Sequence, residues 1–216
     1  MGGRGSGSGG GSLGGGYGKN IDIVNVTDVW TYRHRQSNEP FVDAINTGVG
    51  RIESEFPGVM DTVQTVQAAE LGGLDSIQVL GFYGQGQLAL NQRFTDIGKM
   101  NSVYDKAVQQ GFHPSRGDRT GTEAVALHEM GHALTDHIGK KMGAKSIDEA
   151  AQRIVSAAYK ASGEKAGIKA WAKKISGYAT ESDAECIAEA VADWYCNGSK
   201  STKQSQAIMA ELRKYR

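Results

Sequence analysis

Apolar residues recur every three or four positions between residues 38 and 56, and this spacing predicts an amphipathic helix. The residues at this spacing are Phe41, Ile45, Val49, Ile52 and Phe56. Pro40 stands near the start of the segment and Pro57 follows its end, two positions at which proline is common around a helix. A second helix is predicted over residues 100–109.

Three shorter runs between these two helices are typical of β-strands. They cover residues 63–69, 77–83 and 87–94, and glycine-containing turns separate them. Short runs bounded by turn residues favour strands over helices. The sequence therefore predicts a small sheet in this part of the chain.

The helical segment around residues 124–134 is apolar on nearly every side, as expected for a helix buried in a core. Thr120 and Glu123 have the T-x-x-E spacing of a capping box, so this helix is predicted to begin just after Thr120. A later helix should begin near Ser182, with Ser182 or Thr180 as its cap. Further helices are predicted over residues 147–161 and 204–215.

Composition divides the chain into a tail and one domain. Residues 1–19 are mostly glycine and serine, which bury too little surface to offset the entropy lost on ordering, so a flexible tail is predicted. Residues 20–216 suffice for one domain with a substantial core. There is no apolar run as long as a membrane span and no hydrophobic core of a secretory signal. We therefore expect neither a membrane partner nor Sec-type export.

Charge and cysteine content narrow the picture further. The 216 residues include 24 basic and 24 acidic ones, so no net charge suggests nucleic acid or an anionic membrane as a partner. Cys186 and Cys196 lie on or just beyond one predicted helix, about 15 Å apart at the rise of an α-helix. That separation is too large for a disulfide, and free thiols favour a reducing compartment.

The sequence His128-Glu129-Met130-Gly131-His132 carries the strongest chemical signal. At about 3.6 residues per turn, the two histidines lie one turn apart on the same helix face, so both imidazoles can reach one metal ion. Glu129 stands where a zinc peptidase keeps the general base that takes a proton from water. The alternative is a pair of core histidines that matches the motif by chance.

A catalytic zinc site needs a third protein ligand and leaves its fourth position to water. Glu185 and Glu189 share one face of the helix predicted from Ser182, which is otherwise largely apolar. Buried carboxylates need partners, and a metal ion together with an imidazole N–H would supply them. Glu185 is therefore predicted to be the third ligand, and Glu189 is predicted to orient a ligating histidine.

The HExxH motif paired with residues 178–190 resembles the catalytic domain of anthrax lethal factor and zincin-like proteins of phages and prophages. The matching segments cover roughly residues 113–195. Cys186 departs from the family, which usually has an aromatic residue there, and this affects packing rather than ligation. The resemblance implies an α+β fold: a zincin-like metalloprotease domain with a small mixed sheet, an active-site helix and C-terminal helices.

The resemblance also implies roles for individual residues. In a gluzincin-type peptidase of this kind, zinc is held by His128, His132 and Glu185, and Glu129 is the general base. The hydroxyl of Tyr178 would stabilise the oxyanion. The residues that would support the ligands are Glu189 and, four positions after His132, Asp136.

Two further expectations concern the cleft. In such enzymes an edge strand beside the active-site helix pairs with extended peptide, and residues 87–92 are our candidate, with an ordinary sheet strand as an equally good alternative. His113 could touch the cleft, but we favour a structural or solvent-exposed histidine. His34 and His137 lack ligand spacing and are expected to be ordinary.

The function expected from these features is a zinc-dependent endopeptidase acting on a protein or peptide, in a bacterial cytoplasm or in association with a virion. A phage structural or head-assembly protein with a structural zinc site is one alternative. A toxin or effector protease domain of a larger delivery protein is another. Glu129 and Tyr178 favour an enzyme, because neither is needed for ligation. The sequence leaves the oligomeric state open.

Overall fold

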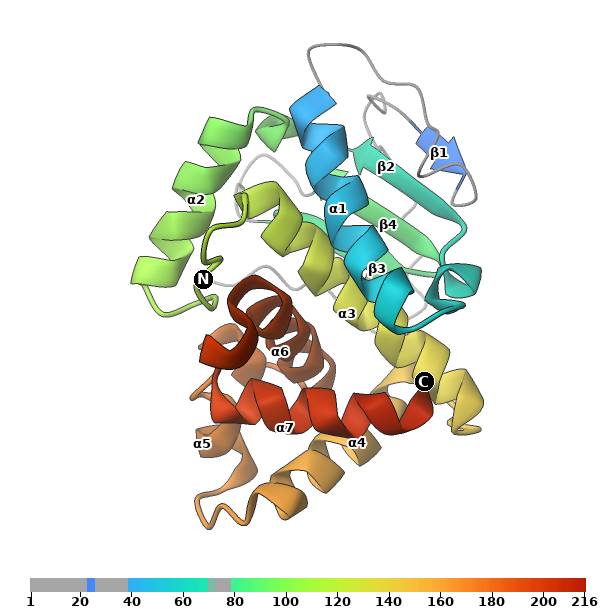
Figure 1. Ribbon diagram of the computed structural model, residues 1–216, viewed down its shortest axis with the longest axis vertical. Coiled ribbons are helices and arrows are strands. Elements are labelled where there is room, and N and C mark those ends of the chain that lie inside the picture. Colours follow the sequence, from blue (N-terminus) through green and yellow to red (C-terminus); the bar gives the residue numbers. More distant parts are fainter. Residues whose placement is uncertain (1–22, 26–38, 70, 72–78) are drawn as a thin grey trace.

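The chain combines helices with a small mixed sheet, arranged around one long helix, α3 (Figure 1). The computed structural model describes residues 23–25, 39–69, 71 and 79–216. The helices are α1 (Glu39–Glu55), α2 (Ile97–Gln109), α3 (Gly121–Lys141), α4 (Ile147–Ser162), α5 (Ile168–Ala172), α6 (Asp183–Asn197) and α7 (Lys203–Leu212). The strands are β1 (Ile23–Asn25), β2 (Thr65–Ala69), β3 (Gly81–Gly84) and β4 (Gln87–Asn91).

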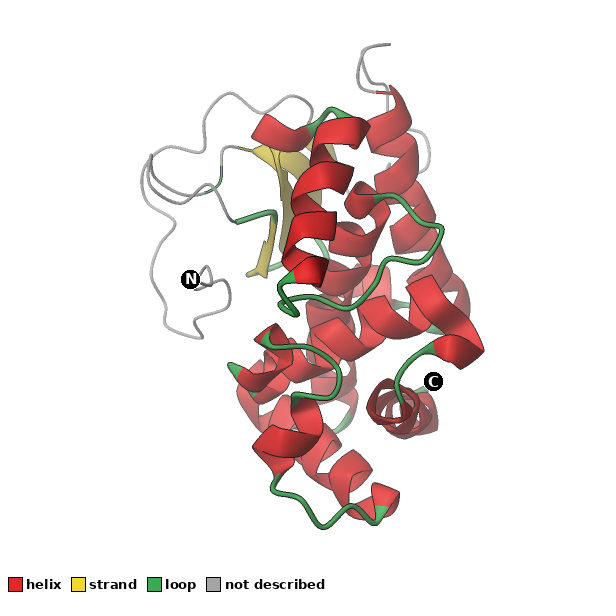
Figure 2. Cartoon of the chain, turned by 90° about the vertical axis from the view of Figure 1, so that its left-hand side faces the viewer, coloured by secondary structure: helices red, strands yellow, loops and turns green. Residues whose placement is uncertain are grey.

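Helix α3 lies between the two halves of the molecule. Helix α1 packs along it on the side of the sheet, and α6 packs along it on the side of the C-terminal helices (Figure 1). Figure 2 shows the strands beside the upper helices, whereas the lower half, as far as it is described, consists of helices and loops. The side chains of Ile52, Leu127 and Ile187, from α1, α3 and α6, are completely buried. One core therefore runs through both halves.

The four strands are ordered β1-β2-β4-β3. Strands β2 and β4 are parallel, with Thr65 opposite Gln87, whereas β1–β2 and β3–β4 are antiparallel. The turn between β3 and β4 contains Gln85 and Gly86 with φ of 52° and 77°. Two successive residues in this left-handed region form the tight hairpin turn that suits the twist of the strands.

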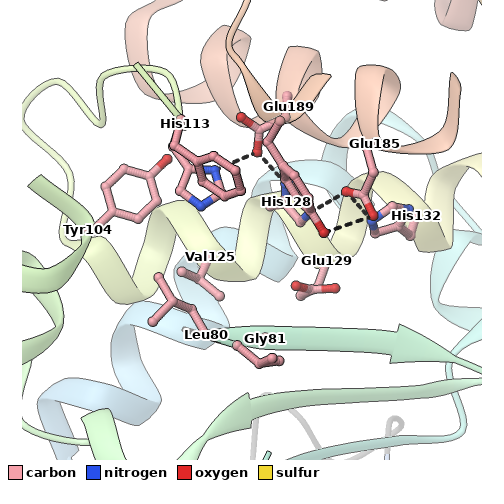
Figure 3. A pocket seen from close by; sticks show the side chains of 13 residues that line it. Leu80, Gly81, Tyr104, His113, Val125, His128, Glu129, His132, Glu185 and Glu189 are labelled. Carbon is pink, nitrogen blue, oxygen red and sulfur yellow. Dashed lines mark hydrogen bonds and ion pairs between the residues drawn. The ribbon is translucent and has the colours of Figure 1, made fainter. Parts of the chain in front are cut away.

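The expectation that residues 87–92 form an edge strand is wrong. Their strand, β4, lies inside the sheet, because it pairs with β2 on one side and with β3 on the other. The parallel pairing of β2 with β4 leaves β3 at the edge of the four described strands. Gly81 of β3 lies against α3, as Figure 3 shows from close by.

Most of the predicted elements are confirmed at nearly the predicted bounds. The predicted helices correspond to α1, α2, α3, α4, α6 and α7. Helix α2 begins three residues earlier than expected, because Asp96 Oδ1 accepts a hydrogen bond from Lys99 N at 2.7 Å and caps it. The sequence reading missed α5 and β1, which have only five and three residues. The predicted tail over residues 1–19 lies outside the described residues, as do residues 77–78 of a predicted strand and His34.

Among the described residues, no helix is both long enough and apolar enough to cross a membrane. Cys186 and Cys196 are free thiols, in agreement with the helical separation predicted for them.

Glu55, near the end of α1, ties this helix to the C-terminal end of the chain. Its carboxylate accepts hydrogen bonds from Arg213 Nε at 2.6 Å and from the Tyr195 hydroxyl at 2.7 Å, and it also contacts Arg216. Burial raises the pKa of Glu55, but the hydrogen bonds from these three groups outweigh burial and lower it. The ionised carboxylate therefore stabilises the fold.

We expect Glu55→Gln to lower the free energy of unfolding at pH 7 by about 1 kcal/mol, because the carboxylate is partly screened by solvent. A lowered pKa in the folded state contributes stability above the unfolded value of 4.5 and loses it as the pH falls through the folded value. The difference between variant and wild type should therefore shrink below pH 4.5, as measured by urea unfolding. Glu181→Gln, at an exposed carboxylate, is the control and should change little. An equal difference at pH 7 and pH 3 would contradict the prediction.

Candidate metal centre

Helices α3 and α6 approach each other backbone to backbone at the centre of the motif. A Cβ atom at Gly131 would lie 2.7 Å from Ala188 Cα and 3.3 Å from Val191 Cβ. Real Cβ atoms do not come so close to a neighbouring backbone atom, so only glycine fits here. The close crossing brings the face of α3 that carries His128 and His132 against α6.

Side-chain caps set where each of these helices begins. Thr120 Oγ1 accepts a hydrogen bond from Glu123 N at 3.0 Å at the start of α3, as the capping box predicts. Ser182 Oγ accepts one from Glu185 N at 3.1 Å at the start of α6. Ser182, and not Thr180, is therefore the cap, and Glu185 stands in the first turn of α6.

His128, His132 and Glu185 form a compact group of possible ligands (Figure 3). One ligand atom from each residue lies within 4.8 Å of the other two. Glu185 Oε2 is 3.2 Å from His128 Nε2 and 3.4 Å from His132 Nε2, so the three side chains point at one another. Two imidazole nitrogens and a carboxylate oxygen are donors that suit a divalent ion such as zinc. The side chains present therefore fit a metal ion.

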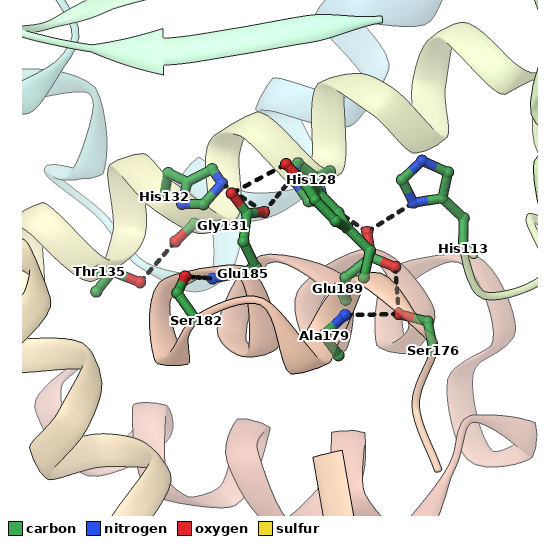
Figure 4. A network of polar contacts seen from close by, with 11 residues as sticks. His113, His128, Gly131, His132, Thr135, Ser176, Ala179, Ser182, Glu185 and Glu189 are labelled. Atoms are coloured by element: carbon green, nitrogen blue, oxygen red, sulfur yellow. Dashed lines mark hydrogen bonds and ion pairs between the residues drawn. The ribbon is translucent and has the colours of Figure 1, made fainter. Parts of the chain in front are cut away.

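Glu189 is a branching point of the polar contacts behind this group (Figure 4). Its Oε1 lies 2.8 Å from His128 Nδ1 and 2.9 Å from His113 Nδ1, while its Oε2 accepts a hydrogen bond from Ser176 Oγ at 2.7 Å. Burial raises the pKa of Glu189, but its contacts with the two imidazoles outweigh burial and lower it to about 2. The structure thus places an ionised carboxylate behind His128.

His113 reaches this network through a pairing of two loops. Gly177 N donates a hydrogen bond to Gly111 O at 2.7 Å, and Tyr178 N donates one to Phe112 O at 3.1 Å. A Cβ atom at Gly177 would lie only 3.0 Å from Gly111 O. The His113 side chain is 14% exposed and lines the pocket, so it touches the cleft. Of the expected alternatives, a solvent-exposed histidine is wrong and a structural one stays open. No local signal in the sequence indicates this pairing.

Tyr178 lies over the ligand group. Its hydroxyl donates a hydrogen bond to Glu185 Oε1 at 3.2 Å, and its ring stacks on that of His128 with centroids 5.8 Å apart. Burial, followed by the charges of Glu185 and Glu129, raises the pKa of Tyr178 far above its ordinary value. The hydroxyl therefore keeps its proton at neutral pH and can act as a hydrogen-bond donor.

Glu129 faces the same pocket from the side of the sheet (Figure 3). Burial raises the pKa of its carboxyl group and outweighs the attraction of His128 and His132. A Cβ atom at Gly81 of β3 would lie 2.5 Å from Glu129 Oε1. The edge strand can come this close to the carboxylate because residue 81 has no side chain.

Asp136 lies apart from the ligand group. It accepts hydrogen bonds from the Tyr83 hydroxyl at 3.2 Å and from Lys140 Nζ at 3.1 Å. Tyr83 belongs to β3, so Asp136 connects α3 to the edge strand. The structure therefore does not bring Asp136 behind a ligating histidine, where the resemblance implies it. His137 is half-buried on the same helix and is absent from the ligand group.

One pocket, between α3, α6, β3 and the loop before α3, is lined by the candidate ligands together with Glu129, Tyr178 and His113. The residues lining it are Val79, Leu80, Gly81, Tyr104, Phe112, His113, Val125, His128, Glu129, His132, Tyr178, Glu185 and Glu189. The apolar members gather around His113 and β3, whereas the acidic members gather where the motif faces α6. His128, His132 and Glu185 can hold a cation, and Glu129 beside them can take a proton. The adjoining apolar wall can contact apolar groups of a ligand.

Comparison of the chain with protein families, with curated proteins and with solved structures found no match.

We expect Gly131→Ala to weaken both the fold and the metal centre. The added methyl group must push the backbone of α6 away, because it meets Ala188 Cα and not a flexible side chain. Such overpacking costs about 1–3 kcal/mol. Urea unfolding should show a loss of this size, and zinc titration should show at least a tenfold weaker affinity.

The matched control is Gly167→Ala, because a Cβ atom there meets nothing within 4 Å. Its zinc affinity should equal that of the wild type. If Gly131→Ala binds zinc as tightly as Gly167→Ala does, the close crossing of the helices does not set the ligand positions.

Proposed function

We propose that the protein is a zinc-dependent endopeptidase of the gluzincin type with a zincin-like fold. The observation that carries the proposal is the position of Glu129. It is a buried carboxylate that shares a pocket with His128, His132 and Glu185 but does not belong to their ligand group. A structural metal site has no use for such a carboxylate, whereas peptide hydrolysis needs a base there.

His128, His132 and Glu185 would hold the zinc ion. When bound, zinc supplies Lewis-acid polarisation of the peptide carbonyl and lowers the pKa of water at the site. Glu129 would accept the proton of the attacking water and pass it to the nitrogen of the leaving amine. Its raised pKa suits the first half of this task, because a carboxylate of low pKa would accept the proton of water poorly.

The Tyr178 hydroxyl would stabilise the negative charge that develops on the carbonyl oxygen. It keeps its proton, and it lies close to Glu185. Glu189 would hold the ring of His128 through the contact of its Oε1 with Nδ1 at 2.8 Å, so that Nε2 points to the metal. Each of these roles is assigned by the resemblance and is compatible with the distances.

The substrate would be an extended peptide aligned along β3. Within the described residues β3 has a strand partner on one side only, so its other edge offers backbone N–H and C=O groups. An extended peptide can add to such an edge as a further strand. Because β3 passes so close to Glu129 that a Cβ atom at Gly81 would clash with it, a peptide bound there would pass near the base.

A phage structural protein with a structural zinc site is the second candidate. The pocket and Glu129 favour the enzyme, because a structural site is closed by its four ligands and needs no cavity beside it. We also propose that the enzyme is encoded by a phage or prophage and acts in the host cytoplasm or a virion. This follows from the resemblance alone. An effector protease domain of a larger delivery protein would use the same site chemistry.

The purified protein should carry about one zinc ion per chain, and His132→Ala or Glu185→Ala should remove it. Elemental analysis of dialysed protein measures the content. Asp136→Asn is the matched control, because this acid lies on the same helix and is bound to Tyr83 and Lys140. Zinc retained in full by Glu185→Ala would refute the ligand assignment.

Glu129→Gln should keep zinc and fold but lose peptide cleavage by orders of magnitude, because glutamine cannot take a proton. A mixed peptide library digested with and without a chelator, and read by mass spectrometry, measures the activity. Circular dichroism and zinc content serve as controls for folding and ligation. If the wild type holds zinc firmly and cleaves nothing, the structural alternative is correct.

A further inference from the structure

His113 is held in one orientation by contacts around its ring. Tyr104 stacks on one face with centroids 5.3 Å apart and planes 8° apart. Phe112 and Tyr178 meet the ring at steep angles, at centroid distances of 4.9 and 5.6 Å. Nδ1 lies 2.9 Å from Glu189 Oε1. A side chain fixed in this way loses little entropy when it binds a ligand.

The two nitrogens of this ring face different surroundings. Nδ1 points at Glu189, whereas the other ring nitrogen, Nε2, is turned toward the pocket (Figure 3). The other side chains that line this part of the pocket, away from the proposed ligands and base, include Leu80, Phe112 and Val125. Besides Glu189 and Tyr104, which contact the ring itself, the wall next to His113 is thus largely apolar.

A peptide lying in this stretch would need such a group. Its side chain can pack against Leu80 and Val125, but each backbone N–H and C=O taken out of water must find a partner. The open edge of β3 can serve the backbone groups that face it. The backbone groups that face α6 and the loop before α3 have His113 Nε2 as a partner.

We propose that His113 is a substrate-binding residue whose Nε2 forms a hydrogen bond with the backbone of a bound peptide carrying an aliphatic side chain. Its Nδ1 contact with Glu189 fixes the ring for this task. The inference rests on the proposed peptidase function and adds a residue to it. The competing interpretation is that His113 only supports Glu189 and, through it, His128.

Substitution by asparagine separates these two interpretations. The amide nitrogen of asparagine takes the place of Nδ1 in a histidine, so His113→Asn keeps a donor for Glu189 and lacks the atom that faces the pocket. Glutamine does the reverse, because its amide reaches the place of Nε2. His113→Asn should therefore keep zinc affinity and lose peptide binding. His113→Gln should lose zinc affinity, by about 10–100-fold if Glu189 no longer holds His128.

Two probes applied to the zinc-loaded full chain measure peptide binding without turnover. Acetohydroxamate contacts the metal alone, whereas a dipeptide hydroxamate with leucine also fills the pocket. Isothermal titration calorimetry gives the dissociation constant of each probe. In His113→Asn the constant for the dipeptide probe should rise about three- to tenfold, the effect of one hydrogen bond, while that for acetohydroxamate stays unchanged.

Unchanged dipeptide binding in His113→Asn would overturn the inference, and so would an equal loss for both probes, because the effect would then come from the metal. A wild type that binds the dipeptide probe no more tightly than acetohydroxamate would overturn it too. Failure of the proposed function looks different. In that case the wild type binds both probes and cleaves no peptide, and the two dissociation constants still decide the role of His113.

Discussion

The candidate site depends on the close crossing of α3 and α6 at Gly131 and Ala188. A larger residue at position 131 would separate the helices, and the carboxylate of Glu185 would withdraw from the two imidazoles of α3. The capping of α6 by Ser182 adds the second constraint, since it fixes the turn of that helix in which Glu185 stands. Small residues inside a buried pair of helices therefore have a chemical consequence beyond packing.

The same crossing of α3 and α6 brings several charged side chains together in the core. Glu129, Glu185 and Glu189 bring three carboxylates into a core, where an unpaired charge is costly. His128 lies among them, and burial alone would lower its pKa, but its contacts with Glu185 and Glu189 outweigh burial and raise it. A divalent cation would relieve the same excess of negative charge. The acidic surroundings therefore suit a cation at this position.

Local signals in the sequence predicted the helices well, because a cap or an apolar repeat is encoded within a few residues. The Thr120 cap of α3 and the early position of Glu185 in α6 are of this kind. The interior position of β4 could not be read in this way, because it depends on parallel pairing with a distant strand. The role of His113 could not be decided from the sequence for a related reason: its place depends on the hydrogen bond between Gly177 and Gly111. The peptidase chemistry remains a proposal.

The absence of a side chain at Gly81 fixes how strand β3 and the carboxylate of Glu129 lie relative to each other. Because a side chain at position 81 would clash with Glu129, the strand approaches this carboxylate closely. In the proposed peptidase, backbone register would therefore set the distance between Glu129 and a peptide paired with β3. A slip of two residues would preserve every backbone hydrogen bond and bring a different peptide bond to the base. The bond that is cleaved would then be determined by the peptide side chains that fit the apolar wall, because these would prevent the shift. In the proposed peptidase, substrate selectivity would depend on the apolar wall of the pocket, whereas catalysis would depend on residues of α3 and α6. The two properties could then change independently.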